Sequence, residues 1–362
     1  MKRLRSPDSP QWSSVALATT LVLAVAVVLT VGTWLLADPA TPRSDALRTA
    51  GIAGGAIIAL YALWLNDRRR RVEEARHALE GDRVSDERFA RSVELLGHDA
   101  DQVRVGAMHA LAGLAKARPD YTQTVLDVLC AYLRRPYLHP RWSGSDSATV
   151  EEREEAEREL QVRLTAQRLV HDLLSESDEA KGAAYDLDFT GAAVEYLDLS
   201  GRRMGTVVLR YAYLHSDSNL SRCVFTGPVW FSHGRTGTGR LEGRFRCDDA
   251  VFEQPAMFRD ATFNSLASFR RSRFADDAAF SGSAFNGTAR FTDATFGELD
   301  LRNTRFAGDV DLRWREAAAV AVDHATVDSG RTLELPDGWR TTSDPDGARL
   351  TAPSTTPASA ST

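Results

Sequence analysis

The hydrophobic and polar positions of this 362-residue chain change rhythm twice between its N-terminus and its C-terminus. Apolar runs without charge come first, apolar residues at helical spacing follow, and from about residue 187 a five-residue step takes over. Because the period of the hydrophobic positions indicates the local structure, we expect three kinds of structure in this order.

The first rhythm predicts two membrane-spanning helices. Residues 13–37 contain no charged side chain, and this run exceeds the roughly 20 apolar residues that are needed to cross a bilayer. A second run, residues 46–65, carries Arg48 near its start, where a long side chain can reach the membrane interface. Together with a basic N-terminus, residues 1–12, this part of the chain predicts a two-helix transmembrane hairpin.

Charges outside the two runs predict the orientation of the hairpin. Lys2, Arg3 and Arg5 precede the first run, and four arginines, residues 68–71, follow the second. Since cytoplasmic flanks carry an excess of basic residues, we expect a multi-pass protein of the cell membrane, with both termini cytoplasmic and the lipid bilayer as a partner. A secretory signal peptide is the alternative, but its apolar region spans only about 7 to 15 residues.

A pair of glycines, Gly51 and Gly55, forms a G-x-x-x-G motif in the second run. Small residues at this spacing let two helix backbones approach closely in lipid. We therefore predict that these glycines pack the second helix against the first, with a homodimer as the alternative.

The second rhythm covers residues 66–180 and predicts a cytoplasmic α-helical segment. Two capping boxes, Asp120 with Gln123 and Thr149 with Glu152, indicate where helices begin. Residues 94–133 resemble a set of HEAT or armadillo helices. Only one or two such units are present, which is fewer than a free-standing solenoid of this kind needs.

The third rhythm is a step of five or six residues between large apolar side chains. It begins at Phe189, Val194 and Leu199, and a small residue often lies two positions before each large one. From residue 252 the large positions are Phe252, Phe258, Phe263, Phe269, Phe274, Phe280, Phe285, Phe291, Phe296, Leu301, Phe306 and Leu312. A helix or a simple strand would scatter these residues over both faces, whereas a chain that turns a corner every five residues would point them all inward.

The segments "YLDLSG" (residues 196–201) and "ATFNS" (residues 261–265) resemble the pentapeptide-repeat family, whose units read approximately A-(D/N)-(L/F)-x-x. The resemblance implies a right-handed quadrilateral β-helix over residues 181–316, in a membrane-anchored bacterial protein of this family. It also implies that the large residue and the small one before it point inward. The predicted structural repeat core is Phe252, Phe258, Phe263, Phe269, Phe274, Phe280, Phe285, Phe291, Phe296 and Phe306.

The repeat is interrupted once and fades at its end. Residues 233–249 keep neither register well, so we expect a loop or a distorted turn there. Residues 317–340 are predicted to cap the last turn. The final residues, 341–362, are rich in Ser, Thr, Pro and Ala and predict a disordered tail.

Composition and charge narrow the set of partners. The formal net charge is −6, from 44 basic and 50 acidic residues, so nucleic acid is not expected as a partner. Three widely spaced cysteines fit no disulfide framework and indicate reduced thiols in the cytoplasm. Residues 183–316 hold 18 acidic side chains and 17 arginines, a near balance that does not imitate duplex DNA.

The sequence offers little catalytic chemistry. Glycines and arginines between residues 234 and 246 lack the strand, helix and lysine of a phosphate-binding loop. Neighbouring carboxylates, Asp248 with Asp249 and Asp276 with Asp277, are expected to point apart or into solvent. No nucleophile-elbow motif is present. We therefore predict no catalytic residue, no cofactor and no metal ligand.

Three hypotheses for the function follow. The first is a non-enzymatic scaffold that binds an unidentified cytoplasmic protein. The alternative is a DNA-mimicking protein that binds a topoisomerase, as some members of the pentapeptide-repeat family do. A second alternative is a β-helix hydrolase or lyase that uses the paired carboxylates.

Overall fold

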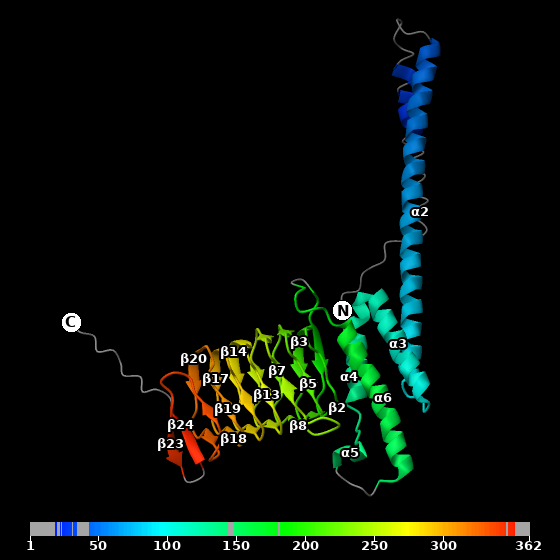
Figure 1. Cartoon of the computed structure of the whole chain (residues 1–362). Coiled ribbons are helices and arrows are strands. Elements are labelled where there is room, and N and C mark those ends of the chain that lie inside the picture. Colours follow the sequence, from blue (N-terminus) through cyan, green and yellow to red (C-terminus); the bar gives the residue numbers. More distant parts are fainter. Residues whose placement is uncertain are drawn as a thin grey trace, which may run out of the picture. The chain divides into compact units, whose positions relative to one another are not determined.

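A computed structural model describes residues 19, 22, 24–30, 32–34, 43–143, 148–179, 182–344 and 347–351. The chain divides into two compact units, Met1–Asp86 and Glu87–Thr362. Figure 1 shows the elements of both.

The first unit consists mainly of the N-terminal part of helix α2 (Arg43–Leu95), which has 53 residues. The second predicted span, residues 46–65, lies within α2, and much of the first, residues 13–37, lies outside the described residues. No helix in the described part of the chain is both long and apolar enough to cross a membrane, so the predicted hairpin is not supported. The predicted packing of Gly51 and Gly55 against the first span stays a prediction, because much of that span lies outside the described residues.

The second unit begins at Glu87 with the last residues of α2, and further helices follow. They are α3 (Asp101–Ala117), the 3-10 helix η1 (Pro119–Tyr121), α4 (Thr122–Leu133), α5 (Pro140–Ser143) and α6 (Val150–Leu173).

One predicted capping box is confirmed and the other is wrong. Thr149 and Glu152 donate their backbone N–H groups to each other's side-chain oxygens, over 2.8 and 3.2 Å, at the start of α6. At the start of α4, however, the N-cap residue is Tyr121 and no side chain caps the helix. The 3-10 turn places Asp120 before that position, and the side chain of Gln123 bonds to the following β-structure.

The helices close the first turn of a β-solenoid and share its hydrophobic core. The amide group of Gln123 pairs with the backbone of Asp186, accepting from its N–H and donating to its C=O over 2.9 Å each. Buried Arg163 donates to the carbonyl oxygen of Ala193 over 3.1 Å, and Gln167 donates to that of Glu195 over 3.3 Å. An uncovered strand edge can pair with a strand of another chain. These side chains bond to the backbone at the edge of the first turn, in the place where another strand would otherwise pair.

The strands of the solenoid form three sheets in the described part of the chain. The first sheet has nine strands: β1 (Tyr185–Asp188), β3 (Arg203–Val208), β6 (Val224–Phe225), β7 (Val229–Trp230), β10 (Val251–Phe252), β11 (Ala256–Met257), β14 (Arg273–Ala279), β17 (Thr295–Asp300) and β20 (Glu316–Ala321).

The second sheet also has nine strands: β2 (Ala193–Glu195), β4 (Tyr213–His215), β8 (Arg235–Gly237), β12 (Thr262–Phe263), β15 (Ala284–Phe285), β18 (Arg305–Phe306), β21 (Thr326–Val327), β23 (Arg340–Asp344) and β24 (Gly347–Thr351). The third sheet has six strands: β5 (Ser218–Asn219), β9 (Phe245–Arg246), β13 (Ala267–Ser268), β16 (Ala289–Arg290), β19 (Val310–Asp311) and β22 (Leu333–Glu334).

Each turn of the solenoid has four sides. Strand β3 pairs with both β6 and β7, and β14 pairs with both β10 and β11, so the first sheet bends around a corner and supplies two sides. All pairings along the solenoid are parallel until β24. The structure thus confirms helices followed by a parallel β-solenoid, which has about seven turns.

Phenylalanine stacks fill the solenoid. All ten residues of the predicted repeat core are at most 4% exposed. Their rings stack between successive turns, with centroids 4.4 Å apart for Phe252 and Phe274 and 5.0 Å apart for Phe274 and Phe296. These spacings match the roughly 4.8 Å between paired strands. Steps of six, five, six and five residues add up to the 22 residues that separate Phe252, Phe274 and Phe296.

Two kinds of corner explain the alternation of five and six. At the five-residue corners one residue adopts a positive φ, between 54° and 60° at Asp260, Asn303 and several others, a region in which Asn and Asp are enriched. At a six-residue corner the backbones of successive turns nearly touch. A Cβ on Gly308 would lie 2.3 Å from the carbonyl oxygen of Gly287, so only glycine fits there.

The C-terminal end differs from its predicted boundaries. The solenoid continues through β20, β21 and β22, where residues 317–340 were expected to form a cap outside the repeat. The actual cap is a hairpin of β23 and β24, in which β24 pairs antiparallel with β21. Residues 341–351 are therefore mostly strand and not tail, while 352–362 lie outside the described residues. Smaller residues there hide the repeat, because Ala317 and Val327 are in register with Phe296 and Phe306.

The phenylalanine stacks predict a sharp contrast between two neighbouring substitutions. Phe274→Asp places a carboxylate between two rings in the core, and we expect it to cost at least the roughly 3 to 5 kcal/mol of a Phe→Ala change. Arg273→Asp alters an exposed side chain and should change stability by about 0.5 kcal/mol or less. Thermal unfolding of the full chain, followed by circular dichroism, measures both. Equal midpoints for the two variants would contradict the assignment of inward positions.

Candidate functional site

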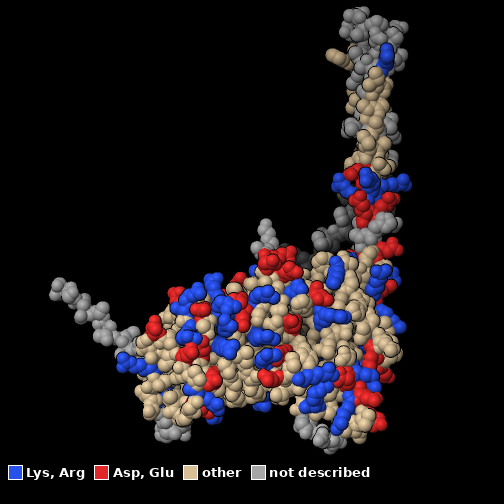
Figure 2. All heavy atoms as spheres, in the orientation of Figure 1, with Lys and Arg blue, Asp and Glu red and all other residues tan. Residues whose placement is uncertain are grey.

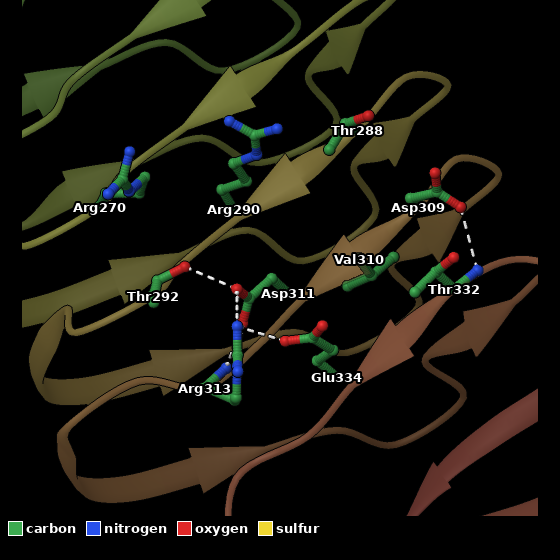
Figure 3. A pocket seen from close by; sticks show the side chains of 10 residues that line it. All are labelled: Arg270, Thr288, Arg290, Thr292, Asp309, Val310, Asp311, Arg313, Thr332 and Glu334. Carbon is green, nitrogen blue, oxygen red and sulfur yellow. Dashed lines mark hydrogen bonds and ion pairs between the residues drawn. The ribbon is translucent and has the colours of Figure 1, made fainter.

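A polar groove of about 450 Å³ runs over the outer face of the third sheet. Strands β13, β16, β19 and β22 and the residues beside them supply its walls, and Figure 3 shows the side chains. They are Arg270, Thr288, Arg290, Thr292, Asp309, Val310, Asp311, Arg313, Thr332 and Glu334. Several hold equivalent positions on successive rungs, as Arg290, Asp311 and Glu334 do, so the strand pairing sets their spacing.

The acidic part of the groove is internally neutralised. Asp311 accepts from the Nε and Nη2 atoms of Arg313 over 3.0 and 2.7 Å, and from the hydroxyl of Thr292 over 2.7 Å. Arg313 also forms an ion pair with Glu334. These contacts, led by the hydrogen bond from Arg313, lower the pKa of Asp311 to about 2. The carboxylate therefore stays charged at neutral pH, and its oxygens accept hydrogen bonds from Arg313 and Thr292.

The basic part of the groove is not neutralised. Arg290 is the register neighbour of Asp311 on the adjacent strand, but the oxygens of Asp311 already serve Arg313 and Thr292. In the described part of the chain neither Arg290 nor Arg270 has a carboxylate within 4.0 Å. Figure 3 shows both guanidinium groups standing apart from the cluster around Arg313. The guanidinium groups of Arg270 and Arg290 can thus pair with an anion from outside the chain.

The carboxylate pairs considered for catalysis do not converge. Asp248 accepts from the backbone N–H of Arg270 and the hydroxyl of Ser268, and Asp249 forms an ion pair with Arg271 at 2.7 Å. Asp276 and Asp277 lie in β14 of the first sheet, and Asp277 is 4.0 Å from Arg259. The two pairs lie on different sides of the solenoid, so no general acid faces a general base.

The segment predicted to be irregular, residues 233–249, is shorter in the structure. Strands β8 and β9 stay in the ladder, and only residues 238–244 leave it. Its arginines do not cradle an open anion site. Arg240 forms an ion pair with Glu157 at 2.7 Å, and Arg244 forms one with Asp217 at 2.6 Å.

Beneath this loop lies a buried carboxylate that the sequence did not reveal. Glu195 is fully buried and accepts from the hydroxyl of Ser216 over 2.7 Å and from the backbone N–H of Arg240 over 2.9 Å. Arg141 approaches it to 3.4 Å and also pairs with Glu157 at 2.9 Å. Glu195 points outward from β2, a position usually exposed to solvent, so nothing in the local repeat signals its burial.

Three aromatic rings cover the second sheet next to Glu195. His215 stacks between Trp142 and Tyr213, with ring centroids 3.7 and 4.2 Å away. Burial lowers the pKa of His215 to about 4, although a hydrogen bond to Thr238 and the charge of Glu195 act in the opposite direction. This stack and the Glu195 contacts hold α5 and the loop 238–244 on the solenoid.

The comparisons with known proteins concern the regular part of the solenoid. A family model described as "Pentapeptide repeats (9 copies)" matches residues 248–295 and, in an overlapping second match, residues 269–313. No curated protein and no solved structure matched the chain. The matched residues contain Arg270 and Arg290, whereas Glu195 lies in an earlier turn.

The buried imidazole predicts that the stability of the second unit depends on pH. Unfolding returns His215 to an ordinary pKa of about 6.5, so the unfolded state binds the proton more readily than the folded state. Stability from this group is complete above about pH 6.5 and declines as the pH falls toward 4. Between the fully neutral and the fully protonated imidazole, the contribution of His215 to the free energy of unfolding changes by about 3 kcal/mol.

The measurement is urea unfolding of the full chain at pH 7 and at pH 4.5. His215→Phe keeps a flat ring but cannot be protonated, so its stability should fall less between the two pH values than that of the wild type. His139, whose pKa is also lowered by burial, remains in both proteins. Exposed His324 provides the matched control, and His324→Phe should keep the wild-type dependence. An identical dependence in all three proteins would contradict the role of His215.

Proposed function

We propose that this protein, which belongs to the pentapeptide-repeat family by its solenoid and by its match over residues 248–295 and 269–313, is a non-enzymatic scaffold. It binds a cytoplasmic protein through the outer faces of the solenoid. The observation that supports this most is the pair of arginines in the groove, Arg270 and Arg290, which lack carboxylate partners in the described part of the chain.

The chemistry of the groove favours a partner with carboxylates. Guanidinium groups bind carboxylates through charge-assisted hydrogen bonds, often two at a time. Arg290 lies in β16, which has a parallel partner strand on each side. Arg270 lies in the turn after β13, where its backbone N–H donates to the carboxylate of Asp248 over 3.1 Å and its carbonyl oxygen accepts from the backbone N–H of Asp249 over 2.9 Å. Less backbone freedom is therefore lost when an acidic segment binds.

Attachment to the cell membrane, with both termini in the cytoplasm, is part of the proposal. Its support comes from the sequence, in which residues 13–37 have no charged side chain and residues 68–71 are four arginines. Such an anchor would keep the solenoid and its partner at the cytoplasmic surface of the membrane.

The surface charges favour a scaffold over a DNA mimic. Acidic side chains on the solenoid are paired with arginines, as in Asp249 with Arg271 and Asp328 with Arg305. Figure 2 shows basic and acidic side chains interspersed over the visible face of the solenoid. A duplex presents a dense, uniform row of negative charge, and this pattern differs from it. The separated carboxylate pairs give no support to a hydrolase or lyase.

The test is the binding of a fluorescein-labelled ten-residue peptide of alternating Glu and Ser to the full-length chain at low salt, measured by fluorescence anisotropy. We expect the double variant R270E/R290E to weaken binding at least tenfold, because it reverses both charges. A peptide with Lys in place of Glu should not bind the wild type.

Arg273→Glu is the matched control, since Arg273 is basic and exposed, as Arg290 is, but lies on the first sheet. It should bind the acidic peptide with the wild-type affinity. Binding that is absent from the wild type, or that survives in R270E/R290E, would refute the groove as the site.

A further inference from the structure

A strip of apolar side chains runs along the outside of the solenoid on a different side from the groove. On the side formed by β7, β11 and the C-terminal part of β3, the inward residues are Val207, Val229 and Ala256. Their neighbours on the outside are Val208, Trp230 and Met257, which are in register on three successive strands. All three are only partly buried. We call these three residues the Trp230 strip.

Aromatic and basic side chains border the strip at the adjoining corner. The guanidinium group of Arg210 lies over the ring of Trp230, 4.4 Å from its centroid. Tyr211 is 64% exposed and stacks on His233, with centroids 5.0 Å apart and planes at 3°. In the described part of the solenoid, Tyr211 is more exposed than any other large hydrophobic side chain.

This composition is typical of binding surfaces. Trp, Tyr, Met and Arg are enriched at protein interfaces, and Trp, Tyr and Arg contribute most of the energetic hot spots. The fold does not need these residues for its core, because the inward positions of the same strands are already filled. The strand ladder also orders Trp230 and Met257 before any partner arrives, which reduces the entropy lost on binding.

The charges around the strip indicate the chemistry of the partner. Arg210 has no carboxylate within 4.0 Å in the described part of the chain, and Arg259, on the turn that carries Met257, approaches Asp277 only to 4.0 Å. His233 Nε2 lies 3.8 Å from a carboxylate oxygen of Asp260, and the two form an ion pair only when the imidazole is protonated. The basic group at the border that has no carboxylate partner among the described residues is therefore Arg210.

We propose that the Trp230 strip binds an extended segment of a partner protein that carries apolar side chains and carboxylates. The apolar side chains cover Trp230 and Met257, and a carboxylate pairs with Arg210. This surface lies on another sheet than Arg270 and Arg290, so the solenoid has two separate binding sides. The scaffold can then hold two protein segments at once, which goes beyond binding through the groove alone.

The experiment uses three fluorescein-labelled twelve-residue peptides and the full-length chain. The first alternates Leu and Glu, the second has Ser in place of Leu, and the third has Lys in place of Glu. At 0.5 M salt, where exposed charge pairs are screened, the Leu–Glu peptide should bind at least tenfold more tightly than the Ser–Glu peptide. At low salt it should also bind at least fivefold more tightly than the Leu–Lys peptide.

Variants separate the strip from the groove. Trp230→Ala should weaken binding of the Leu–Glu peptide at least tenfold, and Arg210→Glu should abolish its preference over the Leu–Lys peptide. Both substitutions are on the outer surface, and unchanged thermal midpoints would show that the fold is intact. R270E/R290E should leave the 0.5 M salt affinity unchanged, so the strip can be supported even if the groove is not.

Several outcomes would overturn the proposal. One is equal binding of the Leu–Glu and Ser–Glu peptides at high salt. Another is an unchanged affinity for the Leu–Glu peptide in both Arg210→Glu and Tyr211→Ser. A dimer in sedimentation velocity that Trp230→Ala dissociates would assign the strip to a second copy of the chain. Binding to anionic lipid vesicles that Arg210→Glu abolishes would assign it to a membrane surface.

Discussion

The stacking of one phenylalanine on the next, across a single strand spacing, is the constraint on which the rest of the solenoid depends. Rings 4.4 to 5.2 Å apart, as between Phe252 and Phe274 or Phe269 and Phe291, require that each turn return an inward side chain to the same place, whether the turn uses 22 residues or, as from Phe285 to Phe306, 21. Both kinds of corner serve this requirement. The positive φ at Asp260 keeps one corner short, and the close backbone approach at Gly287 accommodates the extra residue at another.

The same constraint makes the outer surface a rigid lattice. Side chains such as Arg290 and Trp230 are held in rows one strand spacing apart, and their chemistry can change without disturbing the core. The exception is the first turns, where Glu195 points outward but is covered by α5 and the loop 238–244. There the outside of the sheet has become part of a second, polar core, held together by Arg141, Glu157 and Arg240.

The sequence was sufficient for the repeat and insufficient for what lies around it. The positions of Phe252 to Phe306 follow from their spacing, because an inward side chain in each five-residue unit is a local property. Gln123 is a contrary case. Its pattern indicated a capping box, but its amide serves the backbone of Asp186, 63 residues away. The groove was also not predicted. Arg270 and Arg290 are 20 residues apart in the sequence, and their closeness in the fold can be recognised only when the number of residues in each turn is known.

The number of residues in a turn, 22 between Phe252 and Phe274 and 21 between Phe285 and Phe306, also sets what insertions and deletions do to the molecule. Loss of one whole turn would shorten the solenoid by one rung and leave every later side chain on its own side. Loss of a single pentapeptide would instead rotate everything after it by a quarter of a turn, which carries one binding face to the place of another. The number of residues between two surface positions, and not only the identity of those residues, therefore specifies whether they face the same side of the solenoid and can bind partners there.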